Sequence, residues 1–202
     1  MIGTDLSPIQ PDWVPNNCRF ELHDAESYWS FPDNYFDFIH VRCLMGSIKD
    51  WPALYRQIFR CLKPGGWIEH LDYSIAITCD DNSIPAGSVF DGWGDFFQKA
   101  GEDLGQTFRI IEDGRNVQWQ KDVGFENLDH YYFKMPLGGW PSDPKWKKVG
   151  LYNQMITTDS MEGYILFLLR NVCGWTYEAV QDFGAEAKYL LSRPSVHAYF
   201  NV

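Results

Sequence analysis

The stretch that decides the fold is FDFIHVRCLMGSIKDWPALYRQIFRCLKPGGWIEHLDY, residues 36–73. It opens with the apolar run Phe36–Val41, which is typical of a buried central strand in a parallel sheet. Asp50 then precedes a predicted helix over residues 51–62, in which apolar residues recur at intervals of three and four and share one face. The glycines at 65 and 66 end this helix, and residues 67–73 read as the next strand. Strand, helix and strand at this spacing predict a right-handed βαβ unit in a parallel sheet.

Two shorter strands are predicted before this stretch. Residues 1–4 are an apolar start that runs into Asp5 and a proline-containing loop, and residues 18–22 alternate between apolar and polar side chains. Ligands of open α/β sheets bind beyond the carboxyl ends of the strands, so polar residues that follow the strands are expected to meet at one edge. These candidates are Asp5, the turn Asp24–Glu26, the pair Arg42–Cys43, and Asp72. Such carboxylates can bind ribose and adenine in a nucleotide site, and each one taken alone also fits a helix cap or a solvated turn.

The remainder of the chain is predicted to be mainly helical. Apolar periodicity predicts helices over residues 88–104, 113–123, 146–156, 161–172 and 176–192. Residues 125–135 and 197–202 have strand character, and the Pro- and Gly-rich residues 136–141 form a connector. We therefore expect a single domain over residues 1–202, in which residues 144–193 form a helical cap inserted before the last strand.

Composition excludes several classes of protein. The chain has 202 residues and a formal net charge of −10, with no basic run for phosphates, so direct binding to nucleic acid is not expected. The longest apolar run, residues 165–169, is far shorter than the ~20 residues of a membrane span. The first residues do not resemble a secretory signal, so we expect a location inside the cell, in the cytoplasm or nucleus. The five cysteines and five histidines lack the spacing of metal ligands, and no metal site is predicted.

The segments taken together resemble class I S-adenosylmethionine-dependent methyltransferases, and more narrowly the fungal LaeA-like family that is linked to secondary metabolism. The segments that carry the resemblance are IGTDLSPIQP (2–11), FELHDAE (20–26), FDFIHVR (36–42), GSIKDW (46–51), CLKPGGWIE (61–69), PLGGWP (136–141) and HAY (197–199). The resemblance implies an α/β fold with a Rossmann-like sheet, and S-adenosyl-L-methionine as the cofactor.

The resemblance also implies roles for individual residues. Asp5 matches the acid that holds the ribose, with Leu6 beside the adenine. Asp24 and the backbone of Ala25 match the turn that reads the adenine. Arg42 and Cys43 match the segment that flanks the methionine part of the cofactor and its methyl group.

One feature of the family is not found in this sequence. By analogy with dinucleotide sites, a glycine-rich cofactor loop is expected about 20 residues before the ribose acid, and Asp5 leaves no room for it. We therefore expect a Rossmann-like sheet without its first strand and helix, which leaves two half-sheets with exposed edges. The sequence is then an incomplete gene model or fragment, or a natural short form. In both cases we expect it to bind S-adenosyl-L-methionine poorly.

Three functions are compatible with this sequence. The first is a LaeA-like methyltransferase that acts in, or regulates, fungal secondary-metabolite synthesis and takes a small-molecule acceptor. The second is a regulatory protein with a methyltransferase fold but no turnover, for which the family association implies a velvet-domain partner. The third is an enzyme that uses the same pocket for chemistry other than methyl transfer.

The sequence assigns no catalytic base and leaves several side chains open. Methyl transfer depends mainly on proximity and orientation, so no dedicated base is required. His40 and His70 fit core or rim positions as well as a base. The aromatic residues of the cap could form a substrate lid or part of the core, and they are Trp140, Trp146, Tyr152 and Trp175. The lysine cluster 145–148 fits a solvated face or a partner surface.

Overall fold

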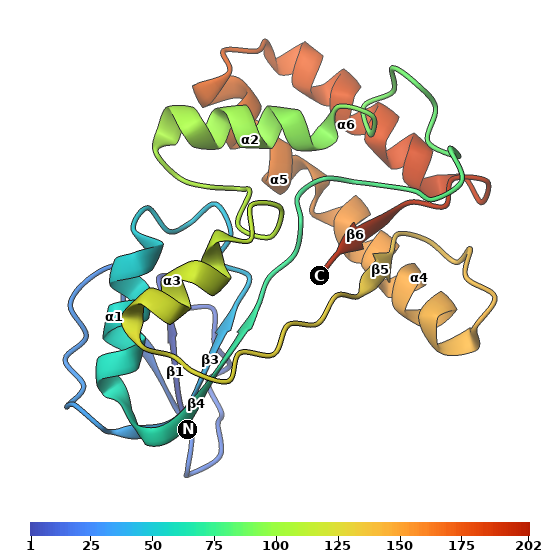
Figure 1. The fold of residues 1–202 in the computed structure, drawn as a ribbon. Coiled ribbons are helices and arrows are strands. Elements are labelled where there is room, and N and C mark those ends of the chain that lie inside the picture. Colours follow the sequence, from blue (N-terminus) through green and yellow to red (C-terminus); the bar gives the residue numbers. More distant parts are fainter. The chain divides into compact units, whose positions relative to one another are not determined.

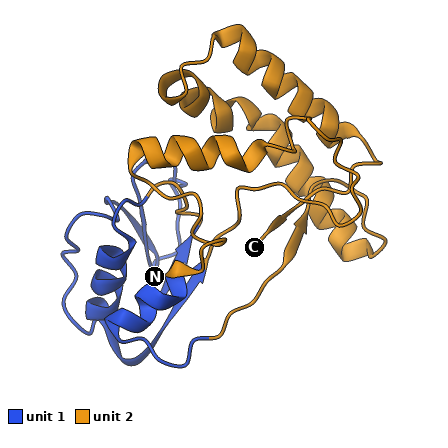
Figure 2. Ribbon diagram, turned by 45° about the horizontal axis from the view of Figure 1, so that its top comes forward, with its two compact units in different colours: residues 1–42, 48–70, 116–128 blue, residues 43–47, 71–115, 129–202 orange.

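The computed structural model describes all residues from 1 to 202, and the chain divides into two compact units (Figure 2). Unit 1 comprises residues 1–42, 48–70 and 116–128, and unit 2 comprises residues 43–47, 71–115 and 129–202. The expectation of a single domain with a cap at 144–193 stays a prediction. The strands (Figure 1) are β1 (Ile2–Asp5), β2 (Arg19–Leu22), β3 (Phe36–Arg42), β4 (Leu62–Leu71), β5 (Lys134–Pro136) and β6 (Tyr199–Asn201). The helices are α1 (Trp51–Cys61), α2 (Trp93–Leu104), α3 (Arg115–Val123), α4 (Pro144–Asp159), α5 (Met161–Phe167), the π-helix Leu168–Val172 and α6 (Tyr177–Ser192).

The strands of unit 1 form two separate two-stranded sheets. β1 pairs with β2 in parallel, and β3 pairs with β4. The ion pairs Asp37–Lys63 and His40–Glu69 join β3 to β4, and because residue numbers rise together along both strands, these strands also run in the same direction. The two half-sheets and the strand–helix–strand unit that the sequence predicts are therefore present.

β3 is in its predicted position, but it is much less buried than its apolar sequence predicts. Phe38 is 54% exposed, and Val41 is the only residue of β3 that is fully buried. Trp67 of β4 is 62% exposed. A central strand is covered on both faces and paired on both edges, whereas β3 has a single strand neighbour in its sheet. The prediction of a strand over residues 36–41 is therefore confirmed, and the prediction that this strand is buried is wrong.

α1 forms where the sequence predicts it, because its signals are local. The carboxylate of Asp50 caps the helix by accepting a hydrogen bond from Ala53 N at 2.8 Å. Pro52 lies in the first turn, where a backbone donor is not needed. The buried face of the helix consists of Trp51, Leu54, Tyr55, Ile58 and Cys61. α1 thus fixes the segment that connects β3 to β4.

Helices dominate unit 2, and aromatic rings fill its core. Trp93 of α2 is buried, with its ring centre 5.1 Å from that of Phe97 and 5.5 Å from that of Phe183 in α6. Trp175 packs edge-on against Phe96 and Phe183. β5 and β6 pair antiparallel, so the strand predicted at the end of the chain is present. No helix of the chain is both long enough and apolar enough to cross a membrane.

Three predicted boundaries after residue 87 are wrong. α2 begins at Trp93 rather than at residue 88, because residues 88–91 form a turn that is closed by a hydrogen bond from Asp91 N to Ser88 O at 3.0 Å. The helix predicted over 161–172 changes from α to π geometry after Phe167. Residues 125–133 are not a strand despite their composition, because backbone pairing with the end of the chain starts only at Phe133.

Candidate functional site

Asp5 is the last residue of β1, and its carboxylate closes the turn that follows. Asp5 Oδ1 accepts a hydrogen bond from Ser7 N at 2.9 Å, and the Asp5 carbonyl accepts one from His23 N at 3.0 Å. The Ser7 contact is the carboxylate's one hydrogen bond, which leaves Oδ2 without a partner. The parallel pairing of β1 with β2 thus places a half-buried acceptor oxygen at the carboxyl edge of this sheet.

The turn after β2 brings Asp24 to the same edge. Asp24 Oδ1 accepts a hydrogen bond from Glu26 N at 2.9 Å, and Asp24 Oδ2 has no partner. The N–H of Ala25 likewise has no acceptor in the protein. Glu26 is used differently, because its Oε1 accepts hydrogen bonds from Lys49 N at 2.7 Å and Asp50 N at 3.2 Å. Glu26 therefore anchors the segment before α1, and the turn offers Asp24 and Ala25 to a ligand.

Leu6 and Arg42 are both exposed. Leu6 follows Asp5 directly and is 72% exposed. Arg42 ends β3, in the other sheet of unit 1, and its guanidinium forms no ion pair or hydrogen bond. The sequence leaves open whether Arg42 pairs with an acid, and in the structure it does not. A free guanidinium suits a two-point contact with a carboxylate.

Cys43 belongs to unit 2, where it begins the segment 43–47. Its φ of 54° lies in the left-handed region, which is uncommon for residues other than glycine. The next two residues are held by the buried Asp72, whose Oδ2 accepts hydrogen bonds from Leu44 N at 3.1 Å and Met45 N at 2.9 Å. Asp72 therefore anchors this segment. The prediction that Asp72 joins a rim of ligand-binding acids is wrong.

Tyr73 is a candidate that sequence reasoning missed. Its ring centre lies 5.7 Å from that of Phe200. Burial raises the pKa of Tyr73 well above its usual range, and the neighbouring Tyr164 and Cys43 act in the same direction. Tyr73 is therefore a neutral phenol that can donate a hydrogen bond and does not act as a base near neutral pH. The signal that could have found it is its place directly after a strand-end acid.

The two histidines named from the sequence are engaged in contacts. His70 Nδ1 lies 2.8 Å from Tyr55 Oη, and the His70 ring stacks on that of Trp51 with centres 5.1 Å apart. His40 Nδ1 lies 2.7 Å from a carboxylate oxygen of Glu69 at an exposed position. Each histidine thus has its Nδ1 atom in contact with another side chain of unit 1.

The aromatic residues of the predicted cap do not form one cluster. Trp175 belongs to the aromatic core of unit 2, and Trp140 Nε1 donates a hydrogen bond to Ala198 O at 3.0 Å. Trp146 and Tyr152 lie on α4 and are exposed. The four rings therefore do not form a shared substrate lid.

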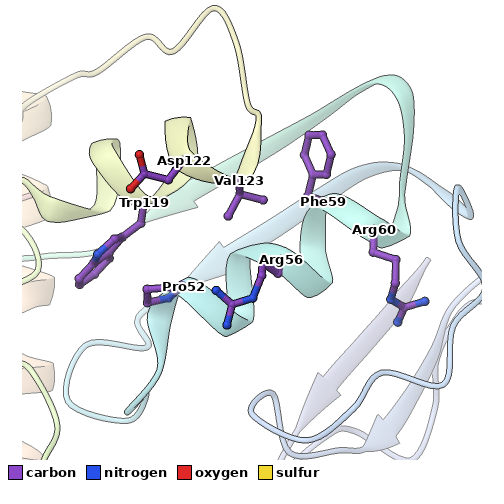
Figure 3. Close-up of a pocket in the computed structure, with 7 residues that line it drawn as sticks. All are labelled: Pro52, Arg56, Phe59, Arg60, Trp119, Asp122 and Val123. Atoms are coloured by element: carbon purple, nitrogen blue, oxygen red, sulfur yellow. The ribbon is translucent and has the colours of Figure 1, made fainter.

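A groove of about 410 Å³ lies between α1 and α3 of unit 1 (Figure 3). The residues that line it are Pro52, Arg56, Phe59, Arg60, Trp119, Asp122 and Val123. None of the six predicted cofactor residues is among them, so this groove gives no support to the cofactor assignment.

The structure thus brings together part of the predicted site. Asp5, Leu6, Asp24 and Ala25 lie at the carboxyl edge of the β1–β2 sheet, whereas Arg42 ends a strand of the other sheet and Cys43 belongs to unit 2. The unpartnered atoms at the first edge are two carboxylate oxygens and one N–H. They match the hydroxyls of a ribose, the amino group of an adenine and a nitrogen of its ring. This donor and acceptor set fits the nucleoside part of the cofactor that the sequence implies.

Comparison with known proteins identifies the family to which the chain belongs. The family profile described as Methyltransferase domain matches residues 1–130. This chain is 35% identical over 202 residues to "Methyltransferase pytC" of Aspergillus terreus, a match that covers 100% of this chain and 61% of the relative. It is 33% identical over 200 residues to laeA of Emericella nidulans, which is named both "Protein-methionine methyltransferase" and "Secondary metabolism regulator". That match covers 98% of this chain and 52% of the relative, so the chain spans little more than half the length of these proteins.

A solved structure is also similar. It is phosphoethanolamine N-methyltransferase 2 of Haemonchus contortus in complex with S-adenosyl-L-methionine, at 19% identity and a TM-score of 0.45. The match covers 91% of this chain and 36% of that chain. Because the TM-score is below 0.5, the family assignment depends on the sequence matches alone.

Proposed function

The chain belongs to the methyltransferase domain family, and we propose that it transfers a methyl group from S-adenosyl-L-methionine to an acceptor in fungal secondary metabolism. The observation that carries the proposal is the pair of unpartnered carboxylate oxygens, on Asp5 and Asp24, at the edge of a parallel sheet within the matched residues 1–130. The mixed α/β fold with small parallel sheets agrees with this family. We place the activity inside the cell, in the cytoplasm or the nucleus.

Four residues of unit 1 would hold the nucleoside part of the cofactor. Asp5 accepts hydrogen bonds from the ribose hydroxyls, and Asp24 accepts one from the adenine amino group. The N–H of Ala25 donates to a ring nitrogen, and Leu6 offers an apolar surface to the adenine. The bound cofactor supplies a methyl group on a positively charged sulfur. Because that methyl group is electrophilic, the protein's main task is to orient the acceptor.

One further residue of unit 1 is assigned to the methionine end of the cofactor. Arg42 of unit 1, with its free guanidinium, suits the carboxylate of the methionine part. We propose a small-molecule acceptor. A methionine side chain of a protein, which the name of the Emericella nidulans relative gives for that relative, is the alternative that the label experiment below distinguishes.

Replacing Asp5 by asparagine tests the cofactor assignment. Asparagine keeps the turn, because its side-chain oxygen can still accept from Ser7 N, but it removes the charge that strengthens bonds to the ribose. A charge-assisted hydrogen bond is worth about 1 kcal/mol more than a neutral one, so we expect affinity to fall roughly fivefold to tenfold. The Kd is measured by ligand-observed NMR, which covers both weak and moderate affinities. Asp12→Asn is the control, since Asp12 is exposed and contacts no other side chain; an equal loss in both variants would show that Asp5 does not hold the ribose.

Transfer of labelled methyl groups tests the activity. The chain is incubated with methyl-labelled S-adenosyl-L-methionine and a fungal extract, which is then separated into small molecules and proteins. Label in the small-molecule fraction that requires the chain supports the proposed acceptor, and label in a protein fraction supports the alternative. No binding of the cofactor and no transfer would favour the two other functions, a methyltransferase-fold protein without turnover or an enzyme with other chemistry.

A further inference from the structure

α4 presents a polar face to the interior of unit 2. Asn153 Nδ2 donates a hydrogen bond to Pro136 O at 2.9 Å, and Gln154 Nε2 donates one to Leu191 O at 2.6 Å. Thr157 is also buried, at 5% exposed. The inward face of this helix is therefore built from polar side chains, each amide tied to a specific backbone carbonyl.

The opposite face of α4 carries exposed apolar side chains. Tyr152, Met155 and Ile156 are each 53% to 55% exposed. Together with Lys148 they fall at positions i, i+4, i+7 and i+8, which is one stripe along a helix. In an ordinary surface helix this stripe would face the core, and here it is turned outward. Single exposed apolar residues are common, but a continuous stripe of this kind marks an interaction surface.

Three lysines lie in the first turns of the same helix. Lys145, Lys147 and Lys148 are exposed, and none of them forms an ion pair. The acid at this end is the N-cap Asp143, whose Oδ1 accepts hydrogen bonds from Lys145 N at 2.9 Å and Trp146 N at 3.0 Å, and it is outnumbered by the three lysines. These lysines stand out in a chain whose formal net charge is −10. The positive end of α4 is thus complementary to a partner that carries carboxylates.

We propose that the α4 face, defined as Lys145, Lys148, Tyr152, Met155 and Ile156, docks an acidic amphipathic helix of a partner protein. The helical spacing of the stripe matches side chains from a second helix laid along it, and the lysines pair with that helix's carboxylates. An anionic membrane is a poorer occupant, because the net charge of −10 opposes it. A second copy of this chain is also poorer, because Asp159 is the only acid that the stripe itself could offer to the lysines.

Binding of a designed peptide tests the proposal. The probe is a fluorescent amphipathic helix of about five turns, with leucines on one face and glutamates elsewhere. Its controls are a scrambled peptide of the same composition and a peptide with lysine in place of glutamate. Fluorescence anisotropy with the full chain should show salt-sensitive binding of the acidic helix alone, because apolar and charged contacts are both required.

Variants of the chain locate the binding. The double variant Tyr152→Ser/Met155→Ser and the double variant Lys145→Glu/Lys148→Glu should each weaken binding by about tenfold or more. The controls are Tyr189→Ser and Lys188→Glu on α6, where the native residues are also exposed, and these should leave the affinity unchanged. The melting temperature of every variant checks that the fold is intact.

Several outcomes would overturn the proposal. These are no binding of the acidic helix, equal binding of the scrambled peptide, or an equal loss in the control variants. If the α4 variants instead abolish sedimentation with phosphatidylserine vesicles, the face binds membranes. If they abolish self-association in sedimentation velocity, the occupant is a second copy. None of these readouts depends on methyl transfer, so the proposed function can fail while this inference stands.

Discussion

Replacing Asp72 by alanine tests whether one buried carboxylate holds the segment 43–47 of unit 2. Its oxygens accept hydrogen bonds from Leu44 N at 3.1 Å, Met45 N at 2.9 Å and Tyr73 N at 3.0 Å. Alanine removes these acceptors. Met45 is buried, and a buried amide without an acceptor costs about 1–3 kcal/mol, whereas water replaces part of the loss at the half-buried Leu44 and Tyr73. We therefore expect the free energy of unfolding to fall by about 2–5 kcal/mol.

Urea unfolding followed by tryptophan fluorescence measures this loss. Asp91→Ala is the matched control, because Asp91 is an exposed carboxylate of the same unit that accepts a bond from Gly87 N at 2.8 Å. Its loss should cost less than about 1 kcal/mol, since water can replace an exposed contact. Asp72→Asn, which retains one acceptor oxygen, should lie between the two. If Asp72→Ala and Asp91→Ala lose the same amount, the carboxylate does not anchor the segment and the reasoning is refuted.

Two further predictions concern unit 2. Hydrogen bonds from Ser83 and then from His197 lower the pKa of Asp81 to about 2, below the value of about 3.9 in an unfolded chain. The contribution of Asp81 to stability is therefore complete above about pH 4 and is lost as the pH falls toward 2. The difference in urea midpoint between the native chain and Asp81→Asn should shrink over that pH range. A difference that stays constant would contradict this prediction. Gly150→Ala should lower the melting temperature, because the overlap of its new Cβ with Gly138 O outweighs a gain in helix propensity of about 1 kcal/mol. The control is Gly163→Ala on α5, where the added Cβ meets open space, and it should leave the melting temperature unchanged or raise it. If both variants raise the melting temperature equally, the contact with Gly138 O does not destabilise Gly150→Ala.

Local signals predicted the elements best. α1 was predictable because the Asp50 cap, Pro52 and the apolar spacing all lie within the helix or next to it. The burial of β3 was not predictable, because it depends on how many strands lie beside it. The start of α2 was predicted too early. Phe90 fits the apolar spacing of the helix and is only 1% exposed, but it lies in the turn before the helix. Burial of an apolar side chain does not require that its backbone be helical.

The roles of the acids at the strand ends could not be predicted from their positions in the sequence either. Asp5, Asp24, Glu26 and Asp72 all follow strands in the sequence, and a rule based on position treats them alike. In the structure, Glu26 binds amides 23 and 24 residues away, and Asp72 binds amides 27 and 28 residues away. Asp24 binds only an amide within its own turn. Which acids remain open to a ligand is therefore decided by contacts distant in sequence, and position after a strand only supplies the candidates.

α4 shows why periodicity predicts a helix more reliably than it predicts the orientation of that helix. The spacing of its apolar residues defines a stripe, and the usual rule turns such a stripe toward the core. Here the inward position is taken by Asn153 and Gln154, because backbone carbonyls of Pro136 and Leu191 lie where these amides can donate to them. A half-buried amide with a partner costs little, whereas the outward stripe forgoes the stabilisation that burial would give. The same helix also begins with three lysines that form no ion pair, so a partner with both acidic and apolar side chains would bury the stripe and pair with the lysines.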